Sequence, residues 1–135
     1  METRLPAQIR CMVYLFLFLL GAVLYVTLEL FWRGRSHISM ALAGGLSLVL
    51  LFGIYTRYPA LPLLARCIVG SAVITAVEFI TGAIVNVRLR LGVWDYSTLP
   101  FNLYGQICPR FSLLWAALCA PASAVVDFVY TSVLA

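Results

Sequence analysis

The sequence predicts an all-α integral membrane bundle of four transmembrane helices, and three observations support this fold class. Of the 135 residues, 64% are hydrophobic and only 10% are charged, and the mean hydropathy is +1.03, far above that of a soluble domain. Four apolar runs follow one another, each near the roughly 20 residues that cross a bilayer. Arginines flank these runs, as expected for side chains that anchor at lipid headgroups. We therefore expect a single transmembrane domain over residues 1–135.

The first two spans are predicted at about residues 11–31 and 39–55. The apolar part of the first span is longer than a signal-peptide core and has no small-residue cleavage site, so we expect it to remain in the mature protein. A short polar turn separates it from the second span. Gly44 and Gly45 would allow a neighbouring helix to approach closely.

The last two spans are predicted at about residues 63–87 and 108–129, joined by a long loop over residues 91–107. Pro121 falls inside the fourth span, where it frees a backbone carbonyl, so we expect a kink or a local opening of that helix. Four spans place both ends of the chain on the same side of the membrane.

Composition excludes several classes of function. All nine basic residues are arginine, so the lysine of a nucleotide-binding P-loop is missing, and any ATPase would be a separate chain. The arginines are scattered along the chain, which gives no basic patch for a nucleic acid. The four cysteines show no metal-binding spacing, and we expect them to behave as small apolar side chains. We predict neither a metal nor a cofactor.

A polar stripe runs along the third span. At about 100° per residue its members fall within a sector of about 80° of an otherwise apolar helix. They are Ser71, Thr75, Glu78, Gly82 and Asn86. Such a stripe should face protein and not lipid. A carboxylate at membrane depth costs about 2.5–3.5 kcal/mol, so Glu78 is a candidate proton, cation or solute site; the alternative is a structural hydrogen bond to a neighbouring span.

Glu29 gives the first span a comparable line of residues, which also contains Tyr14, Gly21 and Tyr25. If these two parallel helices packed through their glycines, Glu29 and Glu78 would approach one another and share a proton. The alternative is that Glu29 pairs with Arg33, four residues later on the same helix.

The stretch at residues 92–106 interrupts the apolar sequence with aromatic, amide and acidic side chains. It could be an ordinary interfacial loop with an aromatic belt, but long loops without structure of their own are usually functional. We interpret it as a capping or partly re-entrant segment packed over the polar stripe. Its candidate site residues are Trp94, Asp95, Tyr96, Asn102 and Gln106. Asp95 would cap a turn or pair with Arg88 or Arg90.

Two further polar residues lie near span ends. His37 has no metal-ligand spacing and is expected to be solvated or interfacial, although chain direction puts it on the same membrane face as the loop. Asp127 is expected to be an interfacial carboxylate partnered by Arg57 or Arg66.

Several motifs resemble those of the putative ABC-transporter type IV (CmpB-like) membrane family. They are A-V-E-F-I-T-G at 76–82, V-W-D-Y-S-x-x-P-F-N-L-x-G-Q-I-C at 93–108 and F-S-L-L-W at 111–115, together with G-A-V-L-Y-V-x-x-E at 21–29 in the N-terminal half. The resemblance covers most of the chain, and it implies a multi-pass, all-helical permease component.

Three functions fit these residues. The first is a transport component in the cell membrane, working as a homo-oligomer, with Glu78, Glu29 and Asn86 at a site under the loop. The second is a helper subunit whose polar stripe binds a partner's transmembrane helix. The third, an enzyme acting on a lipid-linked substrate, has no nucleophile–base spacing to support it.

Overall fold

The computed structural model describes residues 5–134, and within them the secondary structure is helical, which confirms the predicted fold class. The long helices are α1 (Ala7–Arg33), α2 (Ile38–Arg57), α3 (Leu63–Gly82) and α4 (Pro109–Val129). Two π-helical segments, η1 (Ala83–Arg88) and η2 (Tyr130–Leu134), extend α3 and α4. All four long helices have the length and hydropathy needed to cross a membrane.

The helix ends are set by local backbone chemistry. Gly34 ends α1 in the left-handed region (φ 71°), where its N–H donates to the carbonyl of Leu30. His37 begins α2, since its Nδ1 accepts from the N–H of Ser39 at 3.1 Å. Pro109 occupies the first turn of α4, where its missing N–H costs nothing. These signals carry α1 and α2 a few residues beyond the predicted spans.

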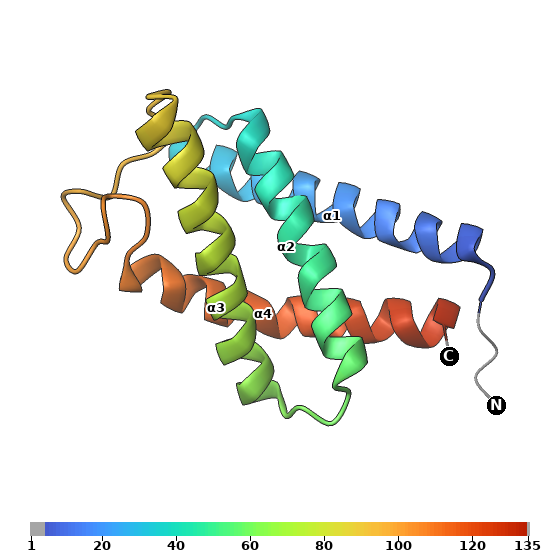
Figure 1. Ribbon diagram of the computed structural model, residues 1–135. Helices are drawn as coiled ribbons and strands as arrows, with labels where there is room; N and C mark the ends of the chain where they lie inside the picture. The colour runs from blue at the N-terminus through green and yellow to red at the C-terminus, as the bar shows by residue number, and fades with distance from the viewer. Residues whose placement is uncertain (1–4, 135) are drawn as a thin grey trace.

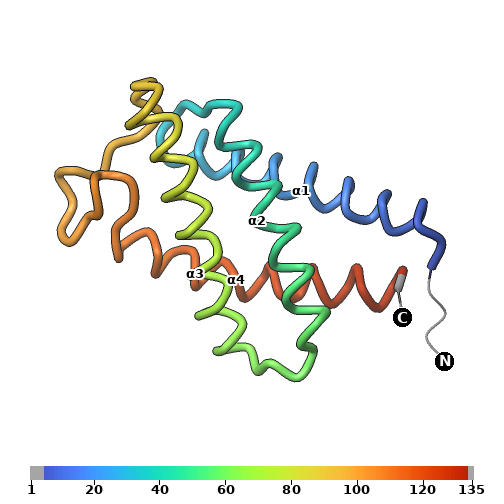
Figure 2. Tube along the Cα trace, viewed as in Figure 1, coloured from blue at the N-terminus to red at the C-terminus, as the bar shows by residue number. Residues whose placement is uncertain are grey.

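The four helices form two layers. Figures 1 and 2 show α2 and α3 crossing in front of α1 and α4, which lie behind them. The connection between η1 and α4, residues 89–108, lies where α1 ends and α2 begins, and we call it the cap. The start of α1 and the end of α4 lie at the opposite end of the molecule, as expected for four spans.

Glycine brings α1 and α2 into close contact. A methyl group added to Gly21 would lie 2.5 Å from the carbonyl oxygen of Gly44, and one added to Gly45 would lie 2.7 Å from that of Phe18. This confirms the predicted close approach at Gly44 and Gly45. Gly21, however, joins α1 to α2 and not to α3, so the glycine packing that would have brought the two glutamates together is not formed.

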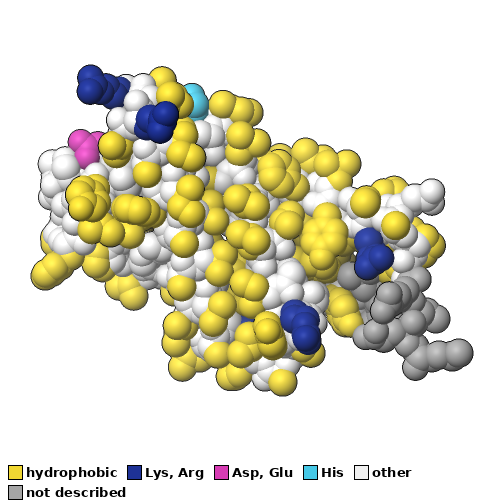
Figure 3. Space-filling model, in the orientation of Figure 1, with side chains coloured by type: hydrophobic (Ala, Val, Ile, Leu, Met, Phe, Trp, Pro, Cys, Tyr) yellow, Lys and Arg dark blue, Asp and Glu magenta, His cyan; other side chains and the backbone are white. Residues whose placement is uncertain are grey.

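The buried side chains form two apolar clusters. One joins α1, α2 and α4 around Leu17, Phe52 and Cys119, and the other lies under the cap around Trp94 and Trp115. The outer surface is also apolar, and on the face drawn in Figure 3 the charged side chains gather near helix ends. An apolar middle with charged ends is the surface a multi-pass membrane protein requires.

α4 continues as one helix through Pro121. The cysteines are free thiols, and Cys108 and Cys119 are buried as expected, but Cys11 is exposed on α1.

Candidate functional site

The polar stripe of α3 faces α4 and the cap. Near its start, the Ser71 hydroxyl donates to the carbonyl of Ser112 at 2.6 Å, and the hydroxyls of Thr75 and Ser112 share a hydrogen bond of 2.8 Å. The expectation that the stripe faces protein is therefore confirmed. Its partners come from this chain's own fourth helix.

Glu78 lies at the centre of the stripe and is only 3% exposed. Its Oε1 accepts a hydrogen bond from the Tyr96 hydroxyl at 2.8 Å, and its Oε2 accepts one from Trp115 Nε1 at 3.1 Å. Tyr96 belongs to the cap and Trp115 to α4, so one carboxylate joins three parts of the chain. We call Glu78, Tyr96 and Trp115 the Glu78 cluster.

Both donors in the Glu78 cluster are uncharged. An indole N–H can only donate, and a phenol O–H donates to an ionised carboxylate. Each oxygen of Glu78 therefore has a hydrogen bond, but among the described residues 5–134 neither oxygen contacts a cation.

Glu29 has a different environment. Its Oε2 accepts from Arg33 Nε at 2.5 Å, which confirms the helical i, i+4 ion pair. Arg33 also donates from Nη1 to the carbonyl of Val93 in the cap at 3.0 Å. The pair thus holds the end of α1 against the cap, and its charges act on Glu78 from a distance.

Asn86, in η1, joins α3 to both ends of the cap. Its Oδ1 accepts from the N–H of Val93 at 2.7 Å, and its Nδ2 donates to Gln106 Oε1 at 2.9 Å. Trp94 Nε1 donates to the carbonyl of Gln106 at 3.0 Å. A methyl group on Gly82 would lie 2.5 Å from Gln106 Oε1 and 2.9 Å from the Trp94 ring, so a larger residue here would displace cap side chains.

The outer part of the cap is held by its own turns. Asp95 Oδ1 accepts from the N–H of Ser97 at 2.9 Å, which agrees with the predicted turn cap and not with an arginine pair. Asn102 donates from Nδ2 to the carbonyl of Leu99 and accepts at Oδ1 from the N–H of Gly105, both at 2.9 Å. These two residues shape the cap but do not contact Glu78.

Aromatic rings enclose Glu78. The Tyr96 ring stacks on Phe111 with centroids 4.6 Å apart, and the Tyr25 ring stacks on Trp115 at 5.4 Å. Burial, followed by the nearby charge of Glu78, raises the pKa of the Tyr96 phenol well above its usual value. Tyr96 therefore stays protonated and remains a hydrogen-bond donor.

The structure brings together most of the predicted site residues. Asn86, Trp94 and Gln106 form one hydrogen-bonded network, which Glu29 reaches through Arg33 and the backbone of Val93. Glu78 and Tyr96 are hydrogen-bonded to each other but belong, with Trp115, to a separate cluster. His37 caps α2 and takes part in neither. Within residues 5–134, no three His, Cys, Asp or Glu side chains gather as metal ligands would.

Sequence reasoning missed the role of Trp115. This residue lies in an apolar run, where an indole is indistinguishable from ordinary core packing. Trp115 lies one helical turn after Ser112, which is the partner of Ser71 and Thr75. This spacing would have indicated that Trp115 reaches Glu78 only if it were already known that α3 and α4 pack against each other through these residues.

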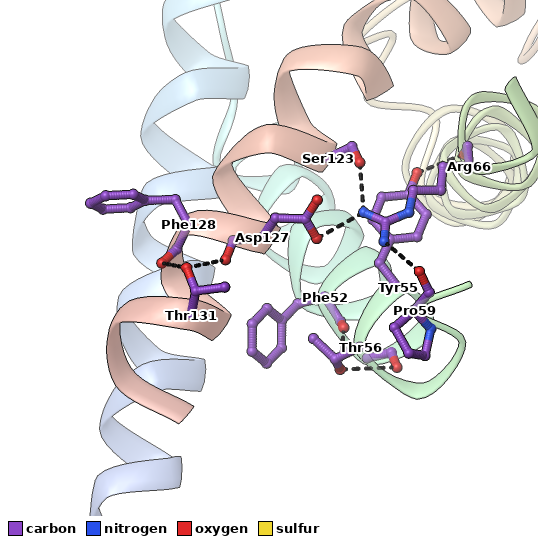
Figure 4. Close-up of polar contacts among 10 residues, drawn as sticks. Phe52, Tyr55, Thr56, Pro59, Arg66, Ser123, Asp127, Phe128 and Thr131 are labelled. Carbon is purple, nitrogen blue, oxygen red and sulfur yellow. Dashed lines mark hydrogen bonds and ion pairs between the residues drawn. The ribbon is translucent and has the colours of Figure 1, made fainter. Parts of the chain in front are cut away.

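A second polar cluster lies toward the start of α3 (Figure 4). Arg66 donates from Nη1 to Asp127 Oδ1 at 2.9 Å and to Ser123 Oγ at 2.8 Å, and from Nη2 to the Pro59 carbonyl at 3.3 Å. Tyr55 donates its hydroxyl to the Arg66 carbonyl at 2.6 Å. This Arg66 cluster confirms Arg66, of the two predicted candidates, as the partner of Asp127.

Comparison with known proteins gives one match. The family described as "Putative ABC-transporter type IV" matches residues 6–135. No curated protein and no solved structure matches the chain.

Proposed function

The chain belongs to the family described as "Putative ABC-transporter type IV", and we propose that it is the membrane-spanning component of a transport system whose coupling site is Glu78. Family membership and four spanning helices support a role in membrane transport. The proposal adds the site, the coupling ion and the moving part.

The contacts of the Glu78 side chain are the main support for this proposal. A buried carboxylate without a contacting cation is costly when ionised, so it tends to take up a proton or a cation. A metal cation needs oxygen lone pairs, but the Trp115 indole offers only an N–H. A proton suits this site better, because the protonated carboxyl can donate to the Tyr96 hydroxyl and still accept from the indole.

The cap is the moving part in this proposal. Its Tyr96 hydroxyl covers Glu78, so proton exchange with water on that side requires the Tyr96–Glu78 hydrogen bond to break. Asn86 and Gln106 hold the base of the cap while Tyr96 moves. The Arg33 contact with the Val93 carbonyl fixes the same base from α1.

We place the chain in the cell membrane as a homo-oligomer or beside a partner membrane subunit, because four helices are few for a solute path. Any ATPase would be a separate chain.

The helper-subunit alternative loses part of its support. Its binding surface was the polar stripe, but the stripe is paired with α4 and the cap of the same chain. A partner helix would have to bind elsewhere. The enzyme alternative gains no observation, because Glu78 contacts a phenol and an indole, neither of which forms an acid–base pair with it at neutral pH.

Proton flux into liposomes tests the proposal. Liposomes containing the purified chain and a pH-sensitive dye should acidify, after an external acid pulse, faster than protein-free liposomes. Glu78→Gln, which fixes the site in a neutral form, should return the rate to that of protein-free liposomes.

Asp95→Asn is the matched control, since it removes an exposed carboxylate from the cap but keeps an oxygen for the Ser97 N–H. It should leave the flux unchanged. A Glu78→Gln flux equal to that of the parent, or a parent no faster than empty liposomes, would contradict the proposal.

A further inference from the structure

The cap divides its aromatic side chains into an inner and an outer set. Trp94 and Tyr96 are buried, whereas Phe101 is 90% exposed and Tyr104 is 79% exposed. These four are all the aromatic residues of the cap. The outer set belongs to residues 101–104, which we call the tip.

The backbone of the cap fixes the outward position of the two outer rings. Phe101 has φ 57° and Tyr104 has φ 54°, in the left-handed region that bulky side chains disfavour. Asn102, between them in sequence, donates to the carbonyl of Leu99 and accepts from the N–H of Gly105. Strained backbone persists only where its surroundings determine it, and it is concentrated at functional sites. The exposure of these rings is therefore built into the loop.

The chemistry of the tip fits the headgroup region of a bilayer. No side chain in residues 97–104 is charged, and aromatic rings accumulate at the level of the headgroups in membrane proteins. Exposed arginines lie on both sides of the tip in sequence, Arg88 and Arg90 before it and Arg110 after it. A guanidinium group pairs readily with a lipid phosphate.

The tip also lies near the points where the chain enters the bilayer. The third spanning segment ends at Arg88 and the fourth begins at Pro109, so both ends of the cap lie at the membrane surface. The N–H of Leu103 donates to the carbonyl of Ile107 at 2.9 Å, which folds the tip back toward the start of α4. Figure 3 shows hydrophobic side chains over the cap as well as over the helices.

The small size of the tip favours lipid over a protein partner. A standard protein–protein interface buries about 800 Å² on each partner and uses about 20–30 residues a side. The exposed large apolar side chains of the tip are only Phe101, Leu103 and Tyr104. A bilayer requires no such area, because the four spanning helices already hold the chain in it.

The tip is connected to the Glu78 cluster through the backbone. The Tyr96 N–H donates to the carbonyl of Gly105 at 2.7 Å, and the Leu99 N–H donates to the carbonyl of Tyr96 at 2.9 Å. Tyr96 in turn donates its hydroxyl to Glu78. A movement of Tyr104, which precedes Gly105, is therefore passed on to the residue that covers the carboxylate.

We infer that Phe101 and Tyr104 insert into the headgroup region of the surrounding bilayer and anchor the cap there. The anchor holds Tyr96 against Glu78. The insertion stands on the tip alone, whereas the effect of the anchor on proton exchange at Glu78 rests on the proposed function.

Tryptophan quenching tests the insertion. The full-length Phe101→Trp variant is placed in phosphatidylcholine liposomes, and its emission is compared with that of the parent. The added emission should be quenched by phosphatidylcholine brominated close to the headgroup, and little by acrylamide in the water. Ile84→Trp, at an exposed position near the end of the third spanning segment, is the lipid-facing reference and should be quenched by brominated lipid to a similar extent.

Tyr104→Trp is the second variant, in case Phe101→Trp does not fold, and it should show the same quenching. Quenching by acrylamide without quenching by brominated lipid would overturn the inference, because the tip would then lie in water. Quenching by neither would also overturn it, because protein would then cover the tip.

Hydrogen–deuterium exchange in nanodiscs tests the hold on Tyr96. Phe101→Asn combined with Tyr104→Asn removes both rings, and asparagine tolerates the left-handed conformation. The N–H groups of Tyr96 and Leu99 should then exchange several-fold faster than in the parent. Thr98→Asn, at an exposed polar position of the same loop, is the matched control and should exchange at the parent rate. Equal rates in the parent and the double variant would overturn the hold.

The anchor and the proposed function fail separately. If brominated lipid quenches Phe101→Trp but the parent moves no protons, the anchor stands and the transport proposal falls. If the parent shows proton flux that Glu78→Gln abolishes, but only acrylamide quenches Phe101→Trp, transport stands and the anchor falls.

Discussion

The Glu78 cluster and the Arg66 cluster both join α3 to α4, but they balance a buried charge in different ways. Arg66 is 6% exposed and meets the Asp127 carboxylate at 2.9 Å, with Ser123 and a backbone carbonyl satisfying further N–H groups. Glu78, 3% exposed, meets a phenol and an indole and, within residues 5–134, no cation. A paired charge holds helices together, whereas an unpaired one is available for protonation. The comparison therefore separates a structural clamp from a candidate site.

Breaking the clamp should have the largest effect on stability. Arg66→Met should lower the free energy of unfolding by about 3 kcal/mol, because it removes the ion pair and leaves the Ser123 hydroxyl and the Pro59 carbonyl without this donor. Unfolding in increasing SDS, followed by circular dichroism, measures the change.

Asp127→Asn is the contrasting variant. The Asp127 side chain is 59% exposed and water can replace part of its role, so the loss should be about 0.5 kcal/mol or less. If the two variants were equally destabilised, the cluster would act through its charge alone and not as a packed clamp.

Removing one of the two hydrogen-bond donors to Glu78 should have an intermediate effect on stability. Trp115→Phe keeps an aromatic ring but deletes the N–H that Glu78 Oε2 accepts, and it should cost about 2 kcal/mol in unfolding free energy at neutral pH. Trp32→Phe, an exposed tryptophan on α1, is the control and should change little. Equal effects at the two positions would show that ring packing, and not the hydrogen bond to Glu78, sets the stability of this region.

The smallest effect is expected at alkaline pH through Tyr96. Burial raises its pKa above the ordinary value of 10.0, so the folded chain keeps this phenol neutral while the unfolded chain ionises it. Stability should be constant below about pH 9 and fall above it, by about 1.4 kcal/mol from this group at about pH 11.

Tyr96→Phe removes the phenol and with it this loss of stability at alkaline pH. Unfolding curves of the parent and the variant are compared from neutral to alkaline pH. The variant should be less stable than the parent at neutral pH, but its free energy of unfolding should fall less as the pH rises. Parallel pH profiles would mean that Tyr96 titrates normally and is not sealed beneath the cap.

The sequence predicted which residues share a face, because helical periodicity depends only on the local chain. The stripe from Ser71 to Asn86 followed from it, and the length and polarity of the loop then indicated a cap over that stripe. The Arg66–Asp127 pair was one of two alternatives, since hydropathy placed both residues near the same membrane face.

Periodicity does not say which helix a face meets. The close contact of Gly21 with Gly44, and not with α3, depends on how helices cross, which no single span encodes. Trp115 as a partner of Glu78 required the register between α3 and α4 in three dimensions.

The polar side chains of α3 find their partners on α4 and the cap, and this has a consequence for biosynthesis. Ser71, Thr75, Glu78 and Asn86 are satisfied by residues that follow within the same helical hairpin. A nascent α3 would therefore carry uncompensated polar groups until α4 emerges from the ribosome. The two helices should leave the insertion machinery together as one hairpin, whereas α1 and α2 are joined to each other by glycines.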